Sequence, residues 1–183
     1  MKALVLSGGG SRGAFQVGVV KSLFEQGFRP DIVTGVSVGA FNSFFIAQRK
    51  LEELESIWLK ITDSEDVYKR RIFAAPLMML GWQWGFPSLY KPGALSKLLK
   101  QKIKSTKQQN YYSELLVGAV DLVTGLYTSV NQRHPLLEKF IAASMAVPMA
   151  FPPVKIKDKK AGGIYVDGCL RNVTPLGEAI RAG

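Results

Sequence analysis

The sequence predicts an α/β fold, because short apolar stretches typical of strands alternate with helix-length apolar stretches and a glycine-rich turn follows each of the first two strands. The first strand is expected at residues 2–7 and the helix after it at residues 14–24. The second strand, at residues 31–36, is β-branched and leads into an apolar helical stretch at residues 39–47. Both turns therefore follow the carboxyl ends of strands, where open α/β sheets bind their ligands.

The later elements complete one predicted domain spanning residues 1–183. Residues 51–61 alternate charged and apolar positions at helical spacing, which predicts an amphipathic surface helix. Residues 117–130 predict two strands joined by a Thr-Gly turn, and residues 163–167 predict another apolar strand. With 47% hydrophobic residues the chain can bury one sizeable core, and no linker or repeat divides it.

The turn after the second strand, Gly35-Val36-Ser37-Val38-Gly39, matches the pattern G-x-S-x-G. In this pattern, glycines on both sides let a serine occupy a sharp, strained turn between a strand and a helix, with its hydroxyl exposed. Ser37 is therefore the candidate nucleophile.

The turn after the first strand, Gly8-Gly9-Gly10-Ser11-Arg12-Gly13, offers consecutive backbone N–H groups that could hold a developing oxyanion. The same residues also satisfy G-x-G-x-x-G, so a dinucleotide-binding Rossmann protein is the first alternative. That fold needs an acidic residue at the end of the second strand, whereas Asp31 opens this strand. The alternative also leaves the serine turn without a role.

A serine nucleophile needs a base, which is usually a histidine. The one histidine, His134, lies in a polar turn and precedes the best acidic candidate, which is the wrong order for an α/β-hydrolase triad. Asp167 is the stronger candidate, because a predicted strand runs directly into Asp167-Gly168 and a carboxylate beside Ser37 could accept its proton. Asp121, on the predicted hairpin, ranks behind it.

These motifs together resemble those of the patatin-like phospholipase family. Gly8 to Gly13 resembles the family's G-G-G-x-R-G loop, Gly35 to Gly39 its G-x-S-x-G elbow, and Asp167-Gly168 the start of its D-G-G/A motif. Residues 121–125 and 142–148 also resemble its central hairpin and the helix that follows. The resemblance implies a three-layer α/β/α sandwich with a mostly parallel central sheet.

The resemblance also implies a serine lipid acyl hydrolase with a Ser37–Asp167 dyad and no histidine, metal or cofactor. The oxyanion hole would comprise Gly8, Gly9, Gly10 and Val38. The supporting motif positions are Ser11, Arg12, Gly13, Gly35, Val36, Gly39, Gly168 and Cys169. Two features depart from the family pattern. Cys169 stands where the family usually has Gly or Ala, and the sequence ends after a predicted helix at residues 175–182, where similar proteins continue.

Composition narrows the expected environment and partners. One cysteine excludes an internal disulfide, and the short apolar start lacks the length of a signal peptide, so we expect a cytoplasmic protein. The net charge of +10, with lysines dense at residues 97–107 and 155–160, suits peripheral contact with an anionic membrane surface, although a solvated face is the simpler interpretation. No nucleic-acid-binding motif accompanies the charge.

Residues 72–90 form an uncharged, aromatic and methionine-rich stretch that Pro76, Gly81, Gly85 and Pro87 interrupt. These breakers argue against a continuous membrane span. A lid or acyl-binding flap over Ser37 and ordinary core packing are both open. The predicted activity is hydrolysis of a lipid or other acyl ester. A catalytically silent lipid-binding or regulatory module is the remaining alternative.

Overall fold

The computed structural model describes residues 1–63, 68–70, 88–93, 98, 101–103, 105–106, 110–158 and 162–183. The strands are β1 Ala3–Leu6, β2 Ile32–Val36, β3 Tyr68–Arg70, β4 Tyr90–Pro92, β5 Glu114–Asp121, β6 Tyr127–Asn131, β7 Val154–Ile156 and β8 Gly163–Asp167. The α-helices are α1 Gly13–Glu25, α2 Val38–Ile46, α3 Leu51–Leu59, α7 Leu137–Ser144 and α8 Leu176–Ala182. Two short 3-10 helices are η1 Gly10–Arg12 and η4 Gly168–Leu170.

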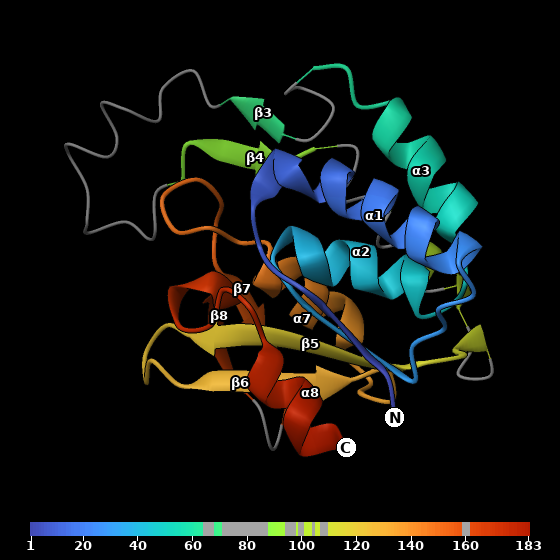
Figure 1. Ribbon diagram of the computed structural model, residues 1–183. Coiled ribbons are helices and arrows are strands. Elements are labelled where there is room, and N and C mark those ends of the chain that lie inside the picture. Colours follow the sequence, from blue (N-terminus) through green and yellow to red (C-terminus); the bar gives the residue numbers. More distant parts are fainter. Residues whose placement is uncertain are drawn as a thin grey trace.

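Helices cover both faces of the main sheet (Figure 1). On one face, α2 packs on β1, β2 and β5, α7 packs on β5 and β8, and α1 and α3 pack against α2. On the other face, α8 packs against β1 and β2. Every residue of β2 is buried, as expected for a strand covered on both faces. The predicted α/β sandwich is therefore confirmed.

The sheet is mixed, with the order β1-β2-β5-β8-β7 and with β6 paired to β5. β1, β2 and β5 are parallel, whereas β6 and β8 run antiparallel to β5, and β7 runs antiparallel to β8. The expectation of a mostly parallel sheet is thus correct only for the first three strands. The physical reason for the two hairpins is that five residues separate β5 from β6 and six separate β7 from β8, which is too few for the crossover that parallel neighbours need.

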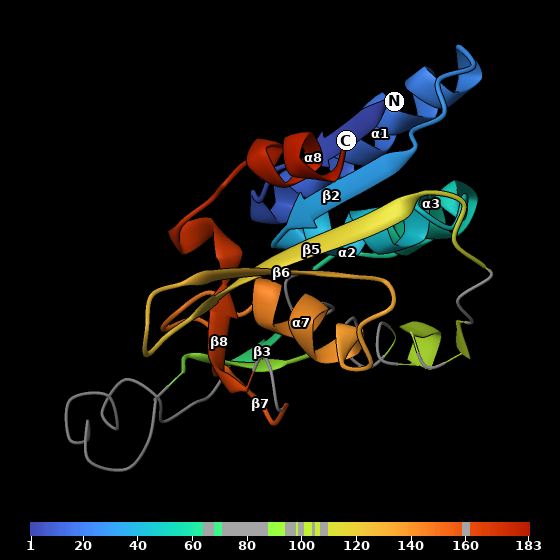
Figure 2. The ribbon, with the colours of Figure 1, turned by 90° about the horizontal axis from the view of Figure 1, so that it is seen from below.

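β5 brings two strand ends together along one of its edges. β2 runs parallel to residues 114–118 of β5, and β8 runs antiparallel to residues 119–121. β6 overlaps both partners in register, at residues 116–120 of β5, so it occupies the opposite edge. β2 and β8 therefore point towards each other (Figure 2). Val36, the last residue of β2, pairs with Gly118, and Asp167, the last residue of β8, pairs with Ala119, so the two carboxyl ends meet there.

Aromatic side chains hold α2 and α7 against this sheet. Phe41, Phe44 and Phe45 of α2 are fully buried, and adjacent rings meet edge to face with centroids 5.2 and 5.3 Å apart. Phe140 of α7 packs on Tyr165 of β8 with a centroid distance of 5.1 Å. Such pairs add about 0.5–1.5 kcal/mol each beyond their buried area. They fix the position of α7, whose last residues reach the end of β2.

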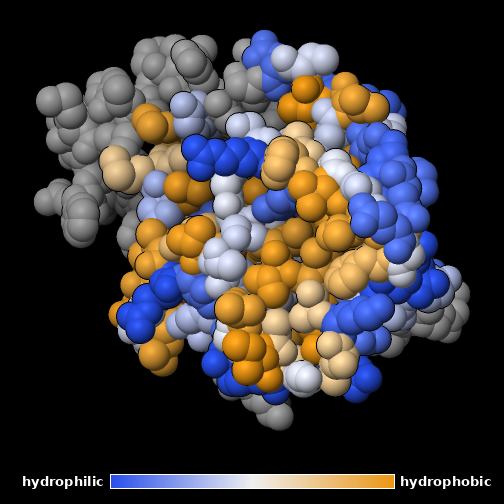
Figure 3. Space-filling view, in the orientation of Figure 1, coloured by the Kyte–Doolittle hydropathy of each residue, from blue (hydrophilic) through white to orange (hydrophobic). Residues whose placement is uncertain are grey.

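A hydrophobic area lies at the centre of the face shown in Figure 3. Among the described residues, Phe15 and Val19 of α1 and Ile180 of α8 are exposed large apolar side chains. None of the described helices is both long enough and apolar enough to span a membrane. The stretch at residues 72–90, for which a lid and ordinary core packing are both open, falls almost entirely outside the described residues, which resume at residue 88.

Candidate active site

Ser37 occupies the turn between β2 and α2 with a left-handed backbone, φ 56° and ψ −129°. A non-glycine residue in this region is strained, and such strain persists only where the surroundings enforce it. Gly35 and Gly39 permit the turn: a Cβ on Gly35 would overlap Gly39 O, and a Cβ on Gly39 would overlap Leu6 O of β1. The turn therefore closes on itself and against β1. Ser37 is only 8% exposed, whereas the motif leads to the expectation of an exposed hydroxyl, because the Gly8 loop and Cys169 pack beside it.

The last residue of β8 is Asp167, which is 2% exposed. Its Oδ1 atom accepts a hydrogen bond of 2.8 Å from the backbone N–H of Cys169 and so caps η4. Its own N–H donates to the carbonyl of Ala146 at 3.0 Å. Both bonds restrict the carboxylate to the junction at which β2 and β8 meet.

Gly168 packs into that junction, because a Cβ there would overlap a methyl group of Val36 and lie 2.6 Å from the carbonyl oxygen of Gly118. Its close approach lets the chain turn away directly after Asp167. The fold thus brings Ser37 and Asp167 together although 130 residues separate them in the sequence (167 − 37).

Burial and nearby hydrogen-bond donors shift the pKa of Asp167 in opposite directions. Burial raises the pKa of its carboxyl, while the Cys169 N–H, the Ser37 hydroxyl and the Cys169 thiol lower it. Oδ2 is buried and has no hydrogen-bond partner among the described residues. The Ser37 hydroxyl is nevertheless close enough to favour the ionised form. This carboxylate is desolvated and has one oxygen free to accept a proton.

The glycine loop lies directly against this pair. A Cβ on Gly8 would overlap Cys169 Sγ and lie 3.0 Å from Ser37 Cβ. Gly10 has φ 58°, which a residue with a side chain rarely adopts. The N–H groups of Gly9, Gly10 and Val38 donate to no group in the described part of the chain.

Gly8 corrects one prediction. Its N–H donates to the carbonyl of Val173 at 3.0 Å, so it is not available to an oxyanion. Its lack of a side chain, which admits Ser37 and Cys169, explains the glycine instead. Ser11 and Arg12 are exposed in η1, and Gly13 begins α1 where a Cβ would overlap Val38 and Trp58.

Ser144 is a residue of the site that the motifs do not predict. Its Oγ accepts a hydrogen bond of 2.8 Å from the Ser37 N–H, and it is fully buried at the end of α7. The Ala146 carbonyl, two residues later, holds Asp167. One segment of α7 and its following turn therefore supports both Ser37 and Asp167. The only sequence signal was the resemblance of residues 142–148 to a family helix.

The two weaker base candidates have structural roles. His134 packs edge to face on Phe140 with a centroid distance of 4.9 Å, and its Nδ1 accepts the N–H of Leu136. Asp121 Oδ1 accepts the N–H groups of Val123 and Thr124 at 2.8 and 3.1 Å and so caps the hairpin turn. Neither side chain contacts Ser37. Within the described ranges no three His, Cys, Asp or Glu side chains cluster in a way that could hold a metal ion.

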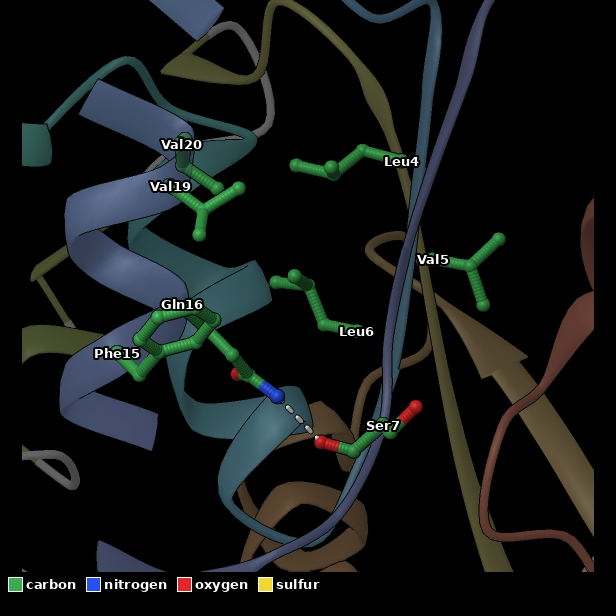
Figure 4. A pocket seen from close by; sticks show the side chains of 8 residues that line it. All are labelled: Leu4, Val5, Leu6, Ser7, Phe15, Gln16, Val19 and Val20. Carbon is green, nitrogen blue, oxygen red and sulfur yellow. Dashed lines mark hydrogen bonds between the residues drawn. The ribbon is translucent and has the colours of Figure 1, made fainter. Parts of the chain in front are cut away.

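An apolar pocket of about 230 Å³ lies between β1 and α1 (Figure 4). It is lined by Leu4, Val5, Leu6, Ser7, Phe15, Gln16, Val19 and Val20. The Gln16 side chain closes one end by donating to the Ser7 carbonyl at 2.7 Å. Ser37 and Asp167 do not line it.

Comparison with known families identifies the group of proteins to which this site belongs. The family described as "Patatin-like phospholipase" matches residues 4–180, which is almost the whole chain. The chain belongs to the patatin-like phospholipase family. Membership accounts for the joint presence of the glycine loop, the serine elbow and the aspartate turn.

Relatives within the patatin-like phospholipase family are distant and longer. The chain is 26% identical to the uncharacterized protein YqhO of Bacillus subtilis, with 94% of this chain and 64% of YqhO covered. It is 28% identical to patatin-like phospholipase domain-containing protein 7 of Rattus norvegicus, and 25% identical to neuropathy target esterase sws of Drosophila melanogaster. The matches cover 99% and 94% of this chain but 13% and 11% of those proteins.

Among solved structures, VipD from Legionella pneumophila has a similar fold, with a TM-score of 0.56. The sequence identity is 15%, and the match covers 91% of this chain and 45% of VipD. The likeness supports the fold and does not extend to activity.

Proposed function

We propose that this protein is a serine lipid acyl hydrolase that cleaves carboxylic esters with Ser37 as nucleophile and Asp167 as general base. The observation that carries the proposal is the head-to-head meeting of β2 and β8 on β5, which unites a strained serine turn with a buried carboxylate that has a free oxygen. Membership of the patatin-like phospholipase family and the similarity to neuropathy target esterase sws support an esterase.

In the proposed reaction, Ser37 Oγ attacks the ester carbonyl while Asp167 Oδ2 takes the hydroxyl proton. Collapse of the tetrahedral intermediate releases the alcohol, which receives that proton from Asp167. Water then attacks the acyl-enzyme, Asp167 accepts a proton from it, and Ser37 regains its hydrogen as the fatty acid leaves. Burial of Asp167 suits this role, because a raised pKa makes a carboxylate a stronger base.

The oxyanion is assigned to the N–H groups of Gly9, Gly10 and Val38. They have no other acceptor among the described residues, and Val38 is the first residue of α2, so its N–H lies at the positive end of the helix dipole. Loss of one such donor typically reduces turnover about 10²–10³-fold. Gly8 is left out of this set because Val173 already accepts its N–H.

We further propose a lipid substrate presented at a membrane surface. The net charge of +10 would attract anionic head groups. A silent lipid-binding module is the competing proposal, and a reaction at Ser37 separates the two.

The deciding experiment measures hydrolysis of a short-chain p-nitrophenyl ester and of anionic phospholipid vesicles, together with fluorophosphonate labelling. Wild type, Ser37→Ala and Asp167→Asn are compared with two matched controls, Ser129→Ala on β6 and Asp31→Asn beyond the opposite end of β2. Loss of turnover only in the two site variants, all proteins remaining folded, is the expected result. A wild type that turns over neither substrate and takes no fluorophosphonate at Ser37 overturns the proposal.

A further inference from the structure

Asn42 is a buried amide in a helix that is otherwise mainly apolar. It lies in the middle of α2, the helix that follows Ser37, and it is 0% exposed. Burial of an amide costs free energy unless its hydrogen bonds are made, so an amide at this position needs a reason. The G-x-S-x-G pattern ends at Gly39 and does not require it.

Both ends of the Asn42 amide have hydrogen-bond partners. Its Nδ2 atom donates to the Gly13 carbonyl at 3.0 Å and to Gln16 Oε1 at 2.9 Å. Its Oδ1 atom accepts the indole N–H of Trp58 at 3.0 Å. Because both N–H groups and the oxygen are paired, the amide is held in one orientation. The side chain therefore joins α2 to α1 and α3.

Gln16 extends this connection to the start of the glycine loop, Gly8 to Gly13. Its Oε1 atom accepts from Asn42, while its Nε2 atom donates to the carbonyl of Ser7, the residue before the loop, at 2.7 Å (Figure 4). Asn42 binds the carbonyl of Gly13, at the other end of the loop, directly. One buried amide thus holds the loop at both ends.

Asn42 also has a fixed relation to Val38, whose N–H group is assigned to the oxyanion. The two residues are four positions apart in α2, so they lie on the same face of the helix, about one turn from each other. A Cβ on Gly13 would overlap a methyl group of Val38, which places the end of the loop beside it. The bonds of Asn42 therefore set the loop against the end of α2 that follows Ser37.

We propose that Asn42 is a positioning residue that, directly and through Gln16, holds the glycine loop where its oxyanion donors can reach the carbonyl attacked by Ser37. The proposal rests on the proposed function. The loop N–H groups and the Val38 N–H come from different elements and must converge on one oxygen. Such donors act in the transition state, so displacement of the loop lowers kcat and leaves KM unchanged.

The test compares wild type with Gln16→Met, Asn42→Ala and a matched control, Gln48→Met. Gln48 is a buried glutamine two residues beyond the end of α2. Like Gln16, it donates to a backbone carbonyl, that of Phe44 at 2.6 Å, and accepts one side-chain hydrogen bond, from Thr106 at 3.2 Å. Neither partner belongs to the glycine loop, so the same substitution removes equivalent bonds without touching it.

Two readouts are followed: kcat and KM for a p-nitrophenyl ester, and the ¹⁵N order parameters of the Gly9 and Gly10 amides. We expect Gln16→Met and Asn42→Ala to lower kcat about 10–100-fold, with KM within about twofold of wild type. The order parameters should fall from about 0.85, typical of rigid backbone, towards about 0.6. Gln48→Met should lower the Tm and leave both readouts unchanged. Wild-type kcat or wild-type order parameters in Gln16→Met, or an equal loss of kcat in Gln48→Met, overturns the proposal.

The order parameters separate this inference from the proposed function. If wild type hydrolyses no ester and takes no fluorophosphonate, the proposed function fails, while the Gly9 and Gly10 amides still report whether the loop is held. If Asn42→Ala does not fold, Gln16→Met decides alone, because it leaves the bonds from Asn42 to the Gly13 carbonyl and from Trp58 in place.

Discussion

Gly8→Ala tests the packing at the centre of the site. The φ angle of Gly8 is not in the left-handed region, so the effect of alanine is expected to come from its added methyl group. That methyl would overlap Cys169 Sγ and lie 3.0 Å from Ser37 Cβ and 3.6 Å from the Val36 carbonyl oxygen. The thiol can rotate away, whereas Ser37 Cβ is fixed by its strained turn.

Overpacking of this kind costs about 1–3 kcal/mol in the free energy of unfolding. For a chain of this size each kcal/mol lowers the Tm by about 2–4 °C, so we expect a drop of roughly 2–12 °C. Displacement of a reacting group by an ångström can reduce turnover about 10²-fold, so kcat/KM should fall by roughly one to two orders of magnitude.

Thermal unfolding and p-nitrophenyl ester hydrolysis measure the two effects. Gly18→Ala is the matched control, because a Cβ there meets no atom within 4 Å and lies inside α1. It should gain about 0.5–1 kcal/mol and keep its activity. The double variant Gly8→Ala with Cys169→Ala should recover part of both losses, since the overlapping sulfur is gone. A Gly8→Ala protein with wild-type Tm and kcat/KM would refute this placement of the glycine loop.

Three further changes probe the surroundings of the proposed dyad. Ser144→Ala leaves the buried Ser37 N–H without its acceptor, so we expect a loss of about 1–3 kcal/mol in the free energy of unfolding and slower fluorophosphonate labelling. Ser144→Thr, which keeps a hydroxyl, should largely rescue both effects. Equal labelling rates in wild type and Ser144→Ala would contradict the role of Ser144. Asp167→Asn should raise the Tm at pH 7 while abolishing turnover. Because burial raises the pKa of Asp167 in the folded state, its ionised carboxylate lowers the stability of wild type at pH values above the unfolded-state pKa of 3.8. The gain in Tm of the asparagine variant must therefore disappear below that pH. Tyr127→Phe removes a buried hydroxyl that has no hydrogen-bond partner among the described residues, so the Tm and activity of this variant should match or exceed those of wild type. A Tm lower by more than about 4 °C would contradict the burial of an unpaired hydroxyl at Tyr127.

The sequence predicted local structure well because the motifs encode it locally. Gly35 and Gly39 allow a serine in a left-handed turn, and apolar stretches fix β2 and α2, so both could be identified without any tertiary information. The direction of β8 could not, because it depends on which edge of β5 is free once β6 has folded back. For the same reason the bond from Ser37 to Ser144 is invisible in sequence: it joins residues 107 positions apart through the packing of α7.

The arrangement of β2 and β8 gives a physical reason why this site can be proposed to work without a histidine. In a sheet whose strands all run in one direction, the carboxyl ends lie side by side and are separated by about 4.8 Å for each step between neighbouring strands. Here two strands on the same edge of β5 end against each other, at the consecutive positions Gly118 and Ala119, so a serine just beyond one end faces an aspartate at the other. The glycines at 118 and 168 keep that gap narrow, because a side chain at either would strike a neighbour. The direct proton transfer that we propose between Ser37 and Asp167 would thus depend on the approach of two strand ends along β5.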